Sequence, residues 1–451
     1  MIKLIDMRLV GKCLGYSSEG KGIIKEQGLI VFVKGLFLNE VAEIEITYQG
    51  KDVCYGKIIK LLTLSPQRIV PHCKVGTACG GCVFQALAYE SELKFKQDKV
   101  QEDLIRIGNI KKDVAAIVPC QNLLHYRNKI QVPLQNIKGK VTYGFYREFS
   151  HSLVTFEECF IENKAANEVI KKTVSIINEF RYPAYDEDQK TGIFRHLLVR
   201  TSENFKEIML VLVTAIDEFP GRNTFIKALM KQLPEVTTII QNINVRTTNV
   251  ILGTKERILF GSGFIKEKLS GLVFKIYPAS FFQINLAQTE LLYMKIKELL
   301  KLQGDEIVLD AYSGLGTIGM ALSPYARQVI SVENNEAAVQ GAKESLRINN
   351  LKNVTIIQDD ATRYLEQLAN TPAKLDVIVL DPPRKGTTQA FIKAALKLKP
   401  KRIVYVSCDP ATLARDLKDF VAQYEIKQII PVDLFPRTYH VENCVLLTLK
   451  Q

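Results

Sequence analysis

A cysteine stands directly after a short apolar run near the end of the chain, in Arg402-Ile-Val-Tyr-Val-Ser-Cys408-Asp-Pro410. The β-branched residues predict a buried strand, which Pro410 should end because proline lacks an amide hydrogen and has a fixed φ. In a parallel α/β sheet, ligands and chemistry gather beyond the carboxyl ends of the strands. Cys408 is therefore a candidate nucleophile, although a free cysteine more often packs as a small buried hydrophobe.

A second group of thiols lies in Cys73-Lys-Val-Gly-Thr-Ala-Cys79-Gly-Gly-Cys82. The chain has no apolar run long enough to span a membrane, so we expect a cytoplasmic protein. In such a protein, cysteines this close together indicate ligands of a soft metal. A fourth ligand must come from further along the chain, and Cys159 is the best candidate. Zinc is the commoner occupant of four-thiolate sites, but its usual signature is two C-x2-C pairs, and the spacing here is C-x5-C-x2-C.

A glycine-rich turn, Asp310-Ala-Tyr-Ser-Gly-Leu-Gly-Thr-Ile-Gly319, follows another apolar segment, and Glu333 closes the next one. The turn contains G-x-G-x-x-G, and the carboxylate of Glu333 is placed to hydrogen-bond ribose hydroxyls. This pattern fits a nicotinamide dinucleotide as well as S-adenosylmethionine, because both present an adenosine ribose. Asp381-Pro-Pro-Arg384 favours the second ligand, since it resembles the acid-Pro-Pro loop that holds a flipped base in nucleic-acid methyltransferases.

These candidate residues fall in a part of the chain, residues 271–451, where apolar strand segments alternate regularly with helical ones. Such alternation predicts a parallel, doubly wound sheet in an α/β domain. The five successive strand candidates are 306–310, 328–333, 354–358, 375–381 and 402–407.

The preceding residues are expected to form two further domains. Residues 1–62 alternate apolar and polar positions between glycines, which predicts a five-stranded barrel; Gly20-Lys-Gly22 and Asn39-Glu40 resemble those of the TRAM domain, an RNA-binding OB-like barrel. A barrel without any ligand is the alternative. Residues 63–270 are mixed α/β, and apolar residues at helical spacing in 91–110 predict an amphipathic surface helix.

Basic residues exceed acidic ones, with a net charge of +12. This excess suggests a polyanionic partner, and residues 123–147 hold cations and aromatic rings with no acid, as contact with phosphates and unpaired bases requires. A solvated face of a sheet is the alternative. The residues that we expect to contact RNA are Tyr126, Arg127, Lys129, Arg147 and Arg195.

Several motifs in order resemble those of the RNA uracil-5 methyltransferase family: Phe282-Gln-Ile-Asn285, Asp310-x-Tyr312-x-Gly314-x-Gly316, Asp381-Pro-Pro-Arg384, Ser407-Cys-Asp-Pro410 and His440-Val-Glu442. With the barrel and the cysteine pattern, the resemblance narrows to the branch that methylates 23S ribosomal RNA. Relatives that act on tRNA usually lack both additions.

This resemblance implies a class I S-adenosylmethionine methyltransferase domain with a Rossmann-like sheet. It implies Cys408 as nucleophile and Glu442 as base, although Glu442 could equally be a solvated turn residue. It also implies that part of residues 86–118 packs on the catalytic domain, and that the protein acts as a monomer. The S-adenosyl-L-methionine site would hold Gln283, Tyr312, Gly314, Gly316, Glu333 and Asp381, and a 4Fe-4S cluster would be bound by Cys73, Cys79, Cys82 and Cys159.

The implied chemistry explains these residue types. Uracil C5 is a poor nucleophile, so a thiolate must add to C6, donors must stabilise the resulting enolate, and a carboxylate must later remove the C5 proton. A free thiol has a pKa of about 8.5, so Cys408 needs a neighbour that stabilises its thiolate. The target base must be flipped out of its stack to reach that thiol.

Other functions account for only part of these features. A nicotinamide-dependent oxidoreductase with an iron–sulfur relay would use the glycine-rich turn and the cysteines, but it leaves both proline motifs unexplained. A non-catalytic RNA-binding scaffold has no need of Cys408 together with Glu442. Within the methyltransferase assignment, tRNA is the alternative substrate.

Overall fold

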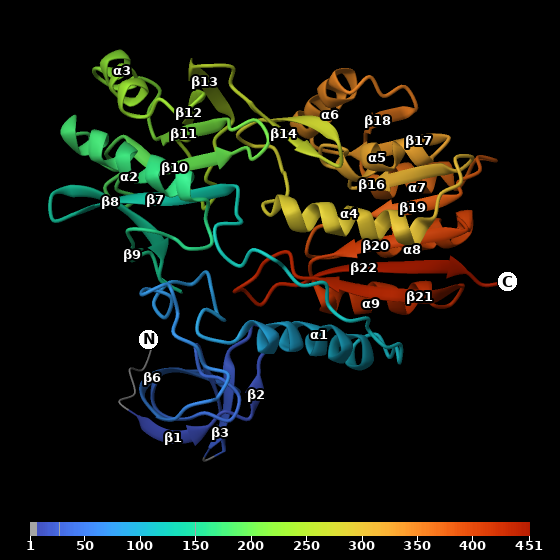
Figure 1. The fold of residues 1–451 in the computed structure, drawn as a ribbon, viewed down its shortest axis with the longest axis horizontal. Coiled ribbons are helices and arrows are strands. Elements are labelled where there is room, and N and C mark those ends of the chain that lie inside the picture. The colour runs from blue at the N-terminus through green and yellow to red at the C-terminus, as the bar shows by residue number, and fades with distance from the viewer. Residues whose placement is uncertain (1–6, 27, 149) are drawn as a thin grey trace.

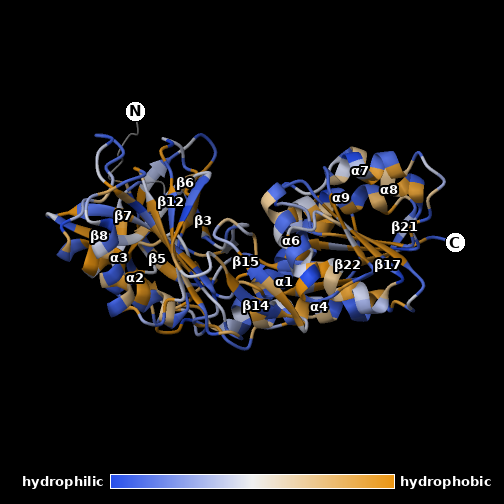
Figure 2. Cartoon of the chain, turned by 90° about the horizontal axis from the view of Figure 1, so that it is seen from above, coloured by the Kyte–Doolittle hydropathy of each residue, from blue (hydrophilic) through white to orange (hydrophobic). Residues whose placement is uncertain are grey.

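The computed structural model describes residues 7–26, 28–148 and 150–451. A small β-domain at the amino terminus, a central α/β domain and a carboxyl-terminal α/β domain follow one another along the chain (Figure 1). Apolar strands fill the interior of the α/β domains, while their helices turn polar faces outward (Figure 2). In the described part of the chain, no helix has the length and apolar character needed to cross a membrane.

The first domain is a six-stranded sheet, in the order β1-β5-β6-β4-β3-β2, with apolar side chains alternating inward along its longer strands. It has one strand more than we expected, because the two-residue strand β2 pairs with β3. The first strand also contacts the third, so the sheet curls around its core. The strands are β1 (Arg8–Lys12), β2 (Gly15–Tyr16), β3 (Gly22–Glu26), β4 (Leu29–Val33), β5 (Val41–Gln49) and β6 (Cys54–Thr63).

Helix α1 (Tyr89–Arg106) runs from the first domain to the third and packs along α9 (Figure 1). The helix is amphipathic, as expected: Val100 and Leu104 are buried in the core of the third domain, while Lys94, Asp98 and Glu102 are exposed. Two charged residues of the helix are buried as well. Lys96 Nζ lies 2.7 Å from a carboxylate oxygen of Glu92 and 2.7 Å from one of Asp433, so the charges compensate one another.

The central domain is built on a seven-stranded sheet in the order β13-β12-β11-β10-β7-β8-β9. Alternate residues of its strands face opposite sides, as the pleat requires. Leu197 of β10 packs under helices α2 and α3, whereas Leu198 belongs to the core shared with the third domain. The elements are β7 (Lys129–Ile137), β8 (Lys140–Tyr146), β9 (Leu153–Thr155), α2 (Lys164–Glu179), β10 (Phe194–Thr201), β11 (Ile208–Thr214), α3 (Arg222–Gln232), β12 (Thr238–Ile243) and β13 (Lys255–Phe260).

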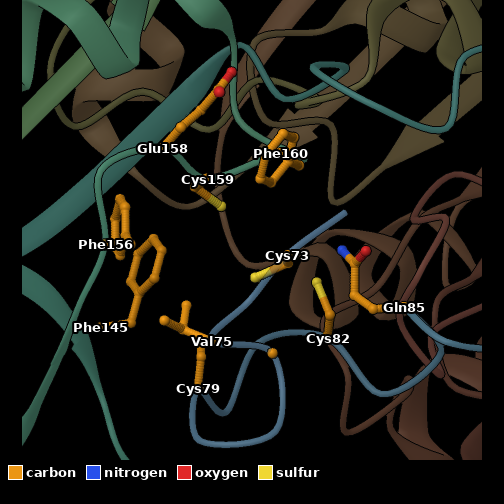
Figure 3. A pocket seen from close by; sticks show the side chains of 11 residues that line it. Cys73, Val75, Cys79, Cys82, Gln85, Phe145, Phe156, Glu158, Cys159 and Phe160 are labelled. Carbon is orange, nitrogen blue, oxygen red and sulfur yellow. The ribbon is translucent and has the colours of Figure 1, made fainter. Parts of the chain in front are cut away.

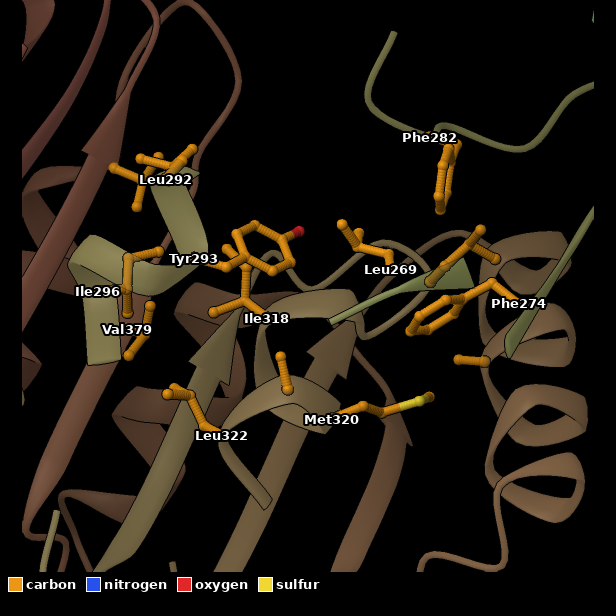
Figure 4. Close-up of a cluster of buried hydrophobic side chains, with 14 of the residues drawn as sticks. Leu269, Phe274, Phe282, Leu292, Tyr293, Ile296, Ile318, Met320, Leu322 and Val379 are labelled. Atoms are coloured by element: carbon orange, nitrogen blue, oxygen red, sulfur yellow. The ribbon is translucent and has the colours of Figure 1, made fainter. Parts of the chain in front are cut away.

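A hairpin of β14 (Ile265–Leu269) and β15 (Leu272–Ile276) leads into the third domain. Its inward side chains meet α4 and α5 in a buried apolar cluster (Figure 4). Phe274 from the hairpin lies 6.2 Å, between ring centroids, from Phe282, which stands just before α4. This packing fixes the loop that connects the central and third domains.

The third domain has the strand order β18-β17-β16-β19-β20-β22-β21. The five expected strands are present and pair in parallel, while β22 and β21 are added in antiparallel orientation. Its strands are β16 (Ile307–Ala311), β17 (Gln328–Glu333), β18 (Val354–Gln358), β19 (Val377–Leu380), β20 (Arg402–Ser407), β21 (Tyr424–Val432) and β22 (Glu442–Leu449). Its helices are α4 (Leu286–Leu300), α5 (Thr317–Leu322), α6 (Glu336–Ile348), α7 (Ala361–Leu368), α8 (Gln389–Leu398) and α9 (Pro410–Phe420).

Candidate active site and cysteine pocket

The sheet of the third domain brings Cys408 and Glu442 together. Cys408 follows the last residue of β20, Ser407, whose partner in the antiparallel strand β22 is Asn443. Continued by one residue, this register brings Cys408 level with Glu442, the first residue of β22, and the carboxyl is near enough to affect the pKa of the thiol. The antiparallel strand therefore starts at the same edge where the parallel strands end, and it delivers a carboxylate there.

The turn after Cys408 is held by the start of the next helix. Asp409 is the N-cap of α9, and its carboxylate accepts a hydrogen bond of 2.9 Å from the amide of Thr412. Pro410 occupies the first turn of α9, where a missing amide hydrogen has no cost. Our interpretation of Pro410 as the residue that ends the strand was therefore wrong: β20 ends at Ser407, and the proline begins a helix.

Charged groups surround the Cys408 thiol. Burial, together with the carboxylates of Glu442 and Asp381, raises the pKa of Cys408 to about 12, and the guanidinium of Arg384 opposes this rise. Nη2 of Arg384 also lies 3.4 Å from Nε2 of His440. Burial lowers the pKa of His440 to about 4, with Arg384 adding to this effect, so the imidazole is neutral at physiological pH. Arg384 is thus the group positioned to stabilise the thiolate.

The carboxyl of Glu442 is buried and that of Asp381 is half-buried. Burial raises the pKa of Glu442 well above its usual value, and Asp381 raises it further while Arg384 opposes the shift. Among the described residues, none forms a hydrogen bond with Oε1 of Glu442. Burial also raises the pKa of Asp381 to about 7. Both carboxyls are therefore better proton acceptors, when ionised, than exposed ones.

The glycine-rich turn follows β16 and begins with a residue in the left-handed backbone conformation. Tyr312 has a φ of +61°, and its hydroxyl lies 2.8 Å from Oγ1 of Thr387. Gly316, with a φ of +72°, is the N-cap of α5. A Cβ on Gly319 would lie 2.6 Å from Oγ of Ser331, so only glycine lets α5 approach β17 this closely.

The carboxylate of Glu333 lies at the carboxyl end of β17 and faces this turn. Its two oxygens accept hydrogen bonds from the amides of Gly314, at 2.9 Å, and Asn335, at 2.8 Å. The side chain is partly exposed. The turn therefore holds the carboxylate in place, and the remaining lone pairs of Glu333 can accept hydrogen bonds from a ligand's hydroxyl groups on its open side.

Gln283 lies on the loop before α4, at the boundary with the central domain. Asn128 holds this loop: its side-chain amide donates to the carbonyl of Gln283 at 3.0 Å, and its backbone amide donates to the carbonyl of Ile284 at 2.9 Å. Asn285 caps α4 by accepting a hydrogen bond of 3.3 Å from the amide of Gln288. The position of Gln283 therefore depends on the central domain.

The four cysteines expected to bind a cluster line a single pocket together with aromatic side chains (Figure 3). Cys159 comes from the central domain, and the amide of Cys159 donates a hydrogen bond of 2.8 Å to Oδ1 of Asn167 in α2. Lys34, in the first domain, donates to the carbonyl of Cys79. Within residues 7–26, 28–148 and 150–451, no three His, Cys, Asp or Glu side chains converge closely enough to hold one metal ion.

Two of the expected RNA contacts were wrong. Tyr126 is only 5% exposed, and its hydroxyl donates to the carbonyl of Pro436 at 3.0 Å. Arg195 is 4% exposed, and its guanidinium donates to the carbonyls of Asn244 and Arg246. Both side chains connect parts of the fold instead of facing a partner.

The other expected RNA contacts differ in their surroundings. Arg127 forms an ion pair with Glu162, with a separation of 3.1 Å between Nε and Oε1. Lys129 is partly buried; burial lowers its pKa to about 8, and the nearby guanidinium of Arg200 adds to this effect. Arg147 is exposed. Lys129 and Arg147 are thus the expected cations that no carboxylate neutralises directly in the described structure.

Comparison with known proteins identifies the family. Residues 88–450 match the family model described as tRNA (Uracil-5-)-methyltransferase. The chain belongs to the RNA uracil-5 methyltransferase family. Among family members, the chain is 41% identical to an "Uncharacterized RNA methyltransferase" of Clostridium tetani, over 96% of this chain and 95% of that one. It is 39% identical to another from Oceanobacillus iheyensis, over 96% of this chain and 94% of that one.

A solved structure of the same family resembles the whole chain. It is the Pyrococcus abyssi tRNA (uracil-54, C5)-methyltransferase in complex with S-adenosyl-L-homocysteine, which has a TM-score of 0.79 and 27% sequence identity. The match covers 97% of this chain and 99% of that one, so it includes the region of the first domain. A fold that matches nearly the whole of this chain therefore occurs in a family member that acts on tRNA.

Proposed function

We propose that this protein transfers a methyl group from S-adenosyl-L-methionine to C5 of uridine in 23S ribosomal RNA, with Cys408 as nucleophile and Glu442 as base. The observation that supports the proposal is the register of β20 and β22, whose last pair, Ser407 with Asn443, stands next to the thiol and the carboxyl at the ligand edge of the sheet. A nicotinamide-dependent oxidoreductase has no use for such a pair. A non-catalytic scaffold would have no reason to bury Glu442 with Oε1 lacking a hydrogen-bond partner among the residues that the structure describes.

The residues act in sequence on the uracil ring. Cys408 adds through its sulfur to C6, and the negative charge moves through the ring to O4. Arg384 favours the thiolate before this step, since it is the cation that opposes the raised pKa of Cys408. After C5 has been methylated, Glu442 removes the C5 proton and the Cys408 thiolate leaves by elimination. The raised pKa of Glu442 makes its carboxylate a stronger base for this step.

The methyl donor would be held by the loops at the same edge of the sheet. When bound, it supplies an electrophilic methyl group on a sulfonium. Glu333 would accept from the ribose hydroxyls, and the Gly314 to Gly316 turn would lie against the adenosine portion. The residues fit S-adenosyl-L-methionine because this turn holds the Glu333 carboxylate, which can accept hydrogen bonds from a ribose. Gln283, Tyr312 and Asp381 are the remaining residues that we propose for the site.

We propose that the four-cysteine pocket holds a 4Fe-4S cluster. Its thiols surround one pocket but do not converge as ligands of a single ion do. A four-iron cluster needs this arrangement because each thiolate binds a different iron, whereas a zinc site needs four thiolates around one centre. The aromatic side chains of Phe145, Phe156 and Phe160 give the pocket an apolar wall. We expect the cluster to organise the fold around the first domain.

Anaerobically purified protein should be brown and contain iron and sulfide in equal amounts. Serine in place of any one of Cys73, Cys79, Cys82 or Cys159 should remove both, because each thiolate would hold one corner of the cluster. Cys54→Ser is the matched control, since Cys54 is a buried thiol of the first domain that does not line the pocket. The measurement is iron and acid-labile sulfide per chain. Zinc without sulfide in the anaerobic protein would contradict the cluster assignment.

We propose that RNA contacts the curled sheet of the first domain, as in TRAM domains, together with Lys129 and Arg147 of the central domain. These cations can attract phosphates because no carboxylate pairs with them directly. Ribosomal RNA is favoured by the resemblance of the cysteine pattern to that of the 23S branch, whereas the first domain does not discriminate, because the match to a tRNA-acting relative includes its region. Transfer RNA is the second candidate, because the solved relative that matches the whole chain acts on tRNA.

A strain lacking the gene should lose 5-methyluridine from 23S ribosomal RNA and keep it in tRNA. Mapping 5-methyluridine in both RNAs, by mass spectrometry of nuclease fragments, measures this directly. Restoring the gene should restore the modification, and restoring a Cys408→Ala copy should not. Loss of 5-methyluridine from tRNA with an unchanged ribosomal RNA would assign the enzyme to tRNA.

A further inference from the structure

Residues 433–441 join β21 to β22 and deliver Glu442 to the candidate active site. Within this segment, Arg437 has a φ of +70°. Residues other than glycine occupy this left-handed region only uncommonly. Its side chain is also buried, with 7% exposed. Both facts indicate that the fold determines the conformation of Arg437 from outside the segment.

The backbone of Arg437 is held by residues that follow the cysteine run. Its carbonyl accepts hydrogen bonds from the amides of Val83, at 3.0 Å, and Phe84, at 3.2 Å. Its own amide donates to Oε1 of Glu92 at 2.7 Å. Val83 is the residue after Cys82, so one peptide bond separates a cysteine of the pocket from a direct contact with Arg437.

The guanidinium of Arg437 continues these contacts. Its Nη1 donates to the carbonyls of Phe84, at 3.4 Å, and Leu87, at 3.0 Å. It lies 3.6 Å from Oε2 of Glu92 and 5.8 Å over the ring of Tyr89. One nitrogen of the guanidinium therefore bridges two carbonyls of the segment that follows the cysteine run.

The same network holds the beginning of the segment. Lys96, which binds Glu92, also lies 2.7 Å from Oδ1 of Asp433, and it donates to the carbonyl of Phe435 at 3.2 Å. Tyr89 donates to the other oxygen of Asp433 at 2.7 Å. The segment before Glu442 is therefore held by residues 83–96 at more than one point.

We propose that Arg437 is a positioning residue that couples the cysteine pocket to the base of the active site. When the cysteines adopt their ligand-holding conformation, residues 83–87 fix Arg437, and Arg437 fixes the course of the chain into Glu442. Release of Cys82 shifts these residues and lets the Glu442 carboxylate leave its place opposite Cys408. The inference rests on the proposed roles of Glu442 and of the cysteine pocket.

Arg437→Gly tests the side chain alone, because glycine tolerates the same φ and keeps the backbone hydrogen bonds. We expect kcat to fall by about tenfold to a hundredfold, with KM for S-adenosylmethionine unchanged, since a small misplacement of a reacting group has effects of this size. Amide hydrogen exchange in residues 437–443 should rise. Arg181→Gly is the matched control, as Arg181 also has a positive φ, of +54°, but is exposed.

Cys82→Ser supplies the second arm of the experiment. In the otherwise unchanged chain it should raise exchange in residues 437–443, and in the Arg437→Gly chain it should add nothing, because the connection is already broken. If Arg437→Gly does not fold, Arg437→Asn serves in its place and should show the same non-additivity, because asparagine tolerates a positive φ but is too short to reach these carbonyls. Full additivity, or an unchanged kcat in the Arg437 variant, overturns the proposal. The exchange measurement needs no methylation, so it separates a failure of this inference from a failure of the proposed function.

Discussion

Cys408→Ala should lower methyl transfer to RNA by roughly ten-thousandfold or more, because the thiol is the group that activates the uracil ring. Binding of S-adenosylmethionine should be nearly unchanged, since the proposed donor site lies in the loops after β16, β17 and β19. The measurements are methyl incorporation into RNA and calorimetric titration with the methyl donor.

The control for this prediction is Cys54→Ala, which removes a buried thiol from the first domain and should keep most of the activity. Equal activity losses in the two variants would indicate general damage to the fold. Methyl transfer by Cys408→Ala at a rate near that of the unchanged protein would assign the nucleophile to another group.

Glu442→Gln should divide the reaction into two halves. The variant keeps the shape of the side chain but removes the base, so it should attach to natural RNA, accept the methyl group at C5 and then stall. Release of the methylated RNA should slow by about a hundredfold to ten-thousandfold, the usual contribution of a general base. A denaturing gel with RNA and methyl-labelled donor detects the stalled adduct as label that migrates with the protein.

Two comparisons sharpen this result. The double variant with Cys408→Ala should retain no label, because the adduct forms through that thiol. Glu425→Gln, a change of an exposed carboxylate on β21, should turn over normally. Normal turnover by Glu442→Gln without retained label would assign proton removal to another group, such as a water molecule held by Asp381.

The strands and motifs of the third domain could be predicted because their signals are local. Each parallel strand is a short apolar run that ends at a polar motif, and this pattern does not depend on distant residues. The pairing of Cys408 with Glu442 is different, since it depends on β22 entering beside β20 with β21 outside it. Sequence reasoning reached this pair through family motifs, and the structure supplies the register.

Burial of charged residues could not be predicted in this way. Their sequence positions place Glu92 and Lys96 on the polar face of an amphipathic helix. Both are fully buried, however, because Asp433, far along the chain, completes their ion-pair network. Arg195 read as a basic surface residue, yet every residue of β10 is buried. Hydropathy reports the cost of burying a charge and contains no information about the partner that offsets it.

Arg384 ends the Asp381-Pro-Pro-Arg384 motif, and the sequence did not indicate a role for it. Its role depends on the distance between the Asp381 loop and the Cys408 turn, which the sequence does not contain. Its residue type could have indicated this role. A guanidinium is always charged, and two prolines directly before it hold it near the edge of the sheet. The structure places it where it opposes the rise in the pKa of Cys408.

Trapping with RNA that contains 5-fluorouridine would identify the nucleophile by a covalent bond. Fluorine at C5 cannot be removed as a proton, so the reaction should stop at a covalent complex in which Cys408 is bound to C6 of the methylated base. Protease digestion and mass spectrometry of the purified complex should map the nucleotide to the peptide that contains Cys408, and Cys408→Ala should give no complex. A nucleotide attached to any other residue, or an undiminished complex with Cys408→Ala, would contradict the account.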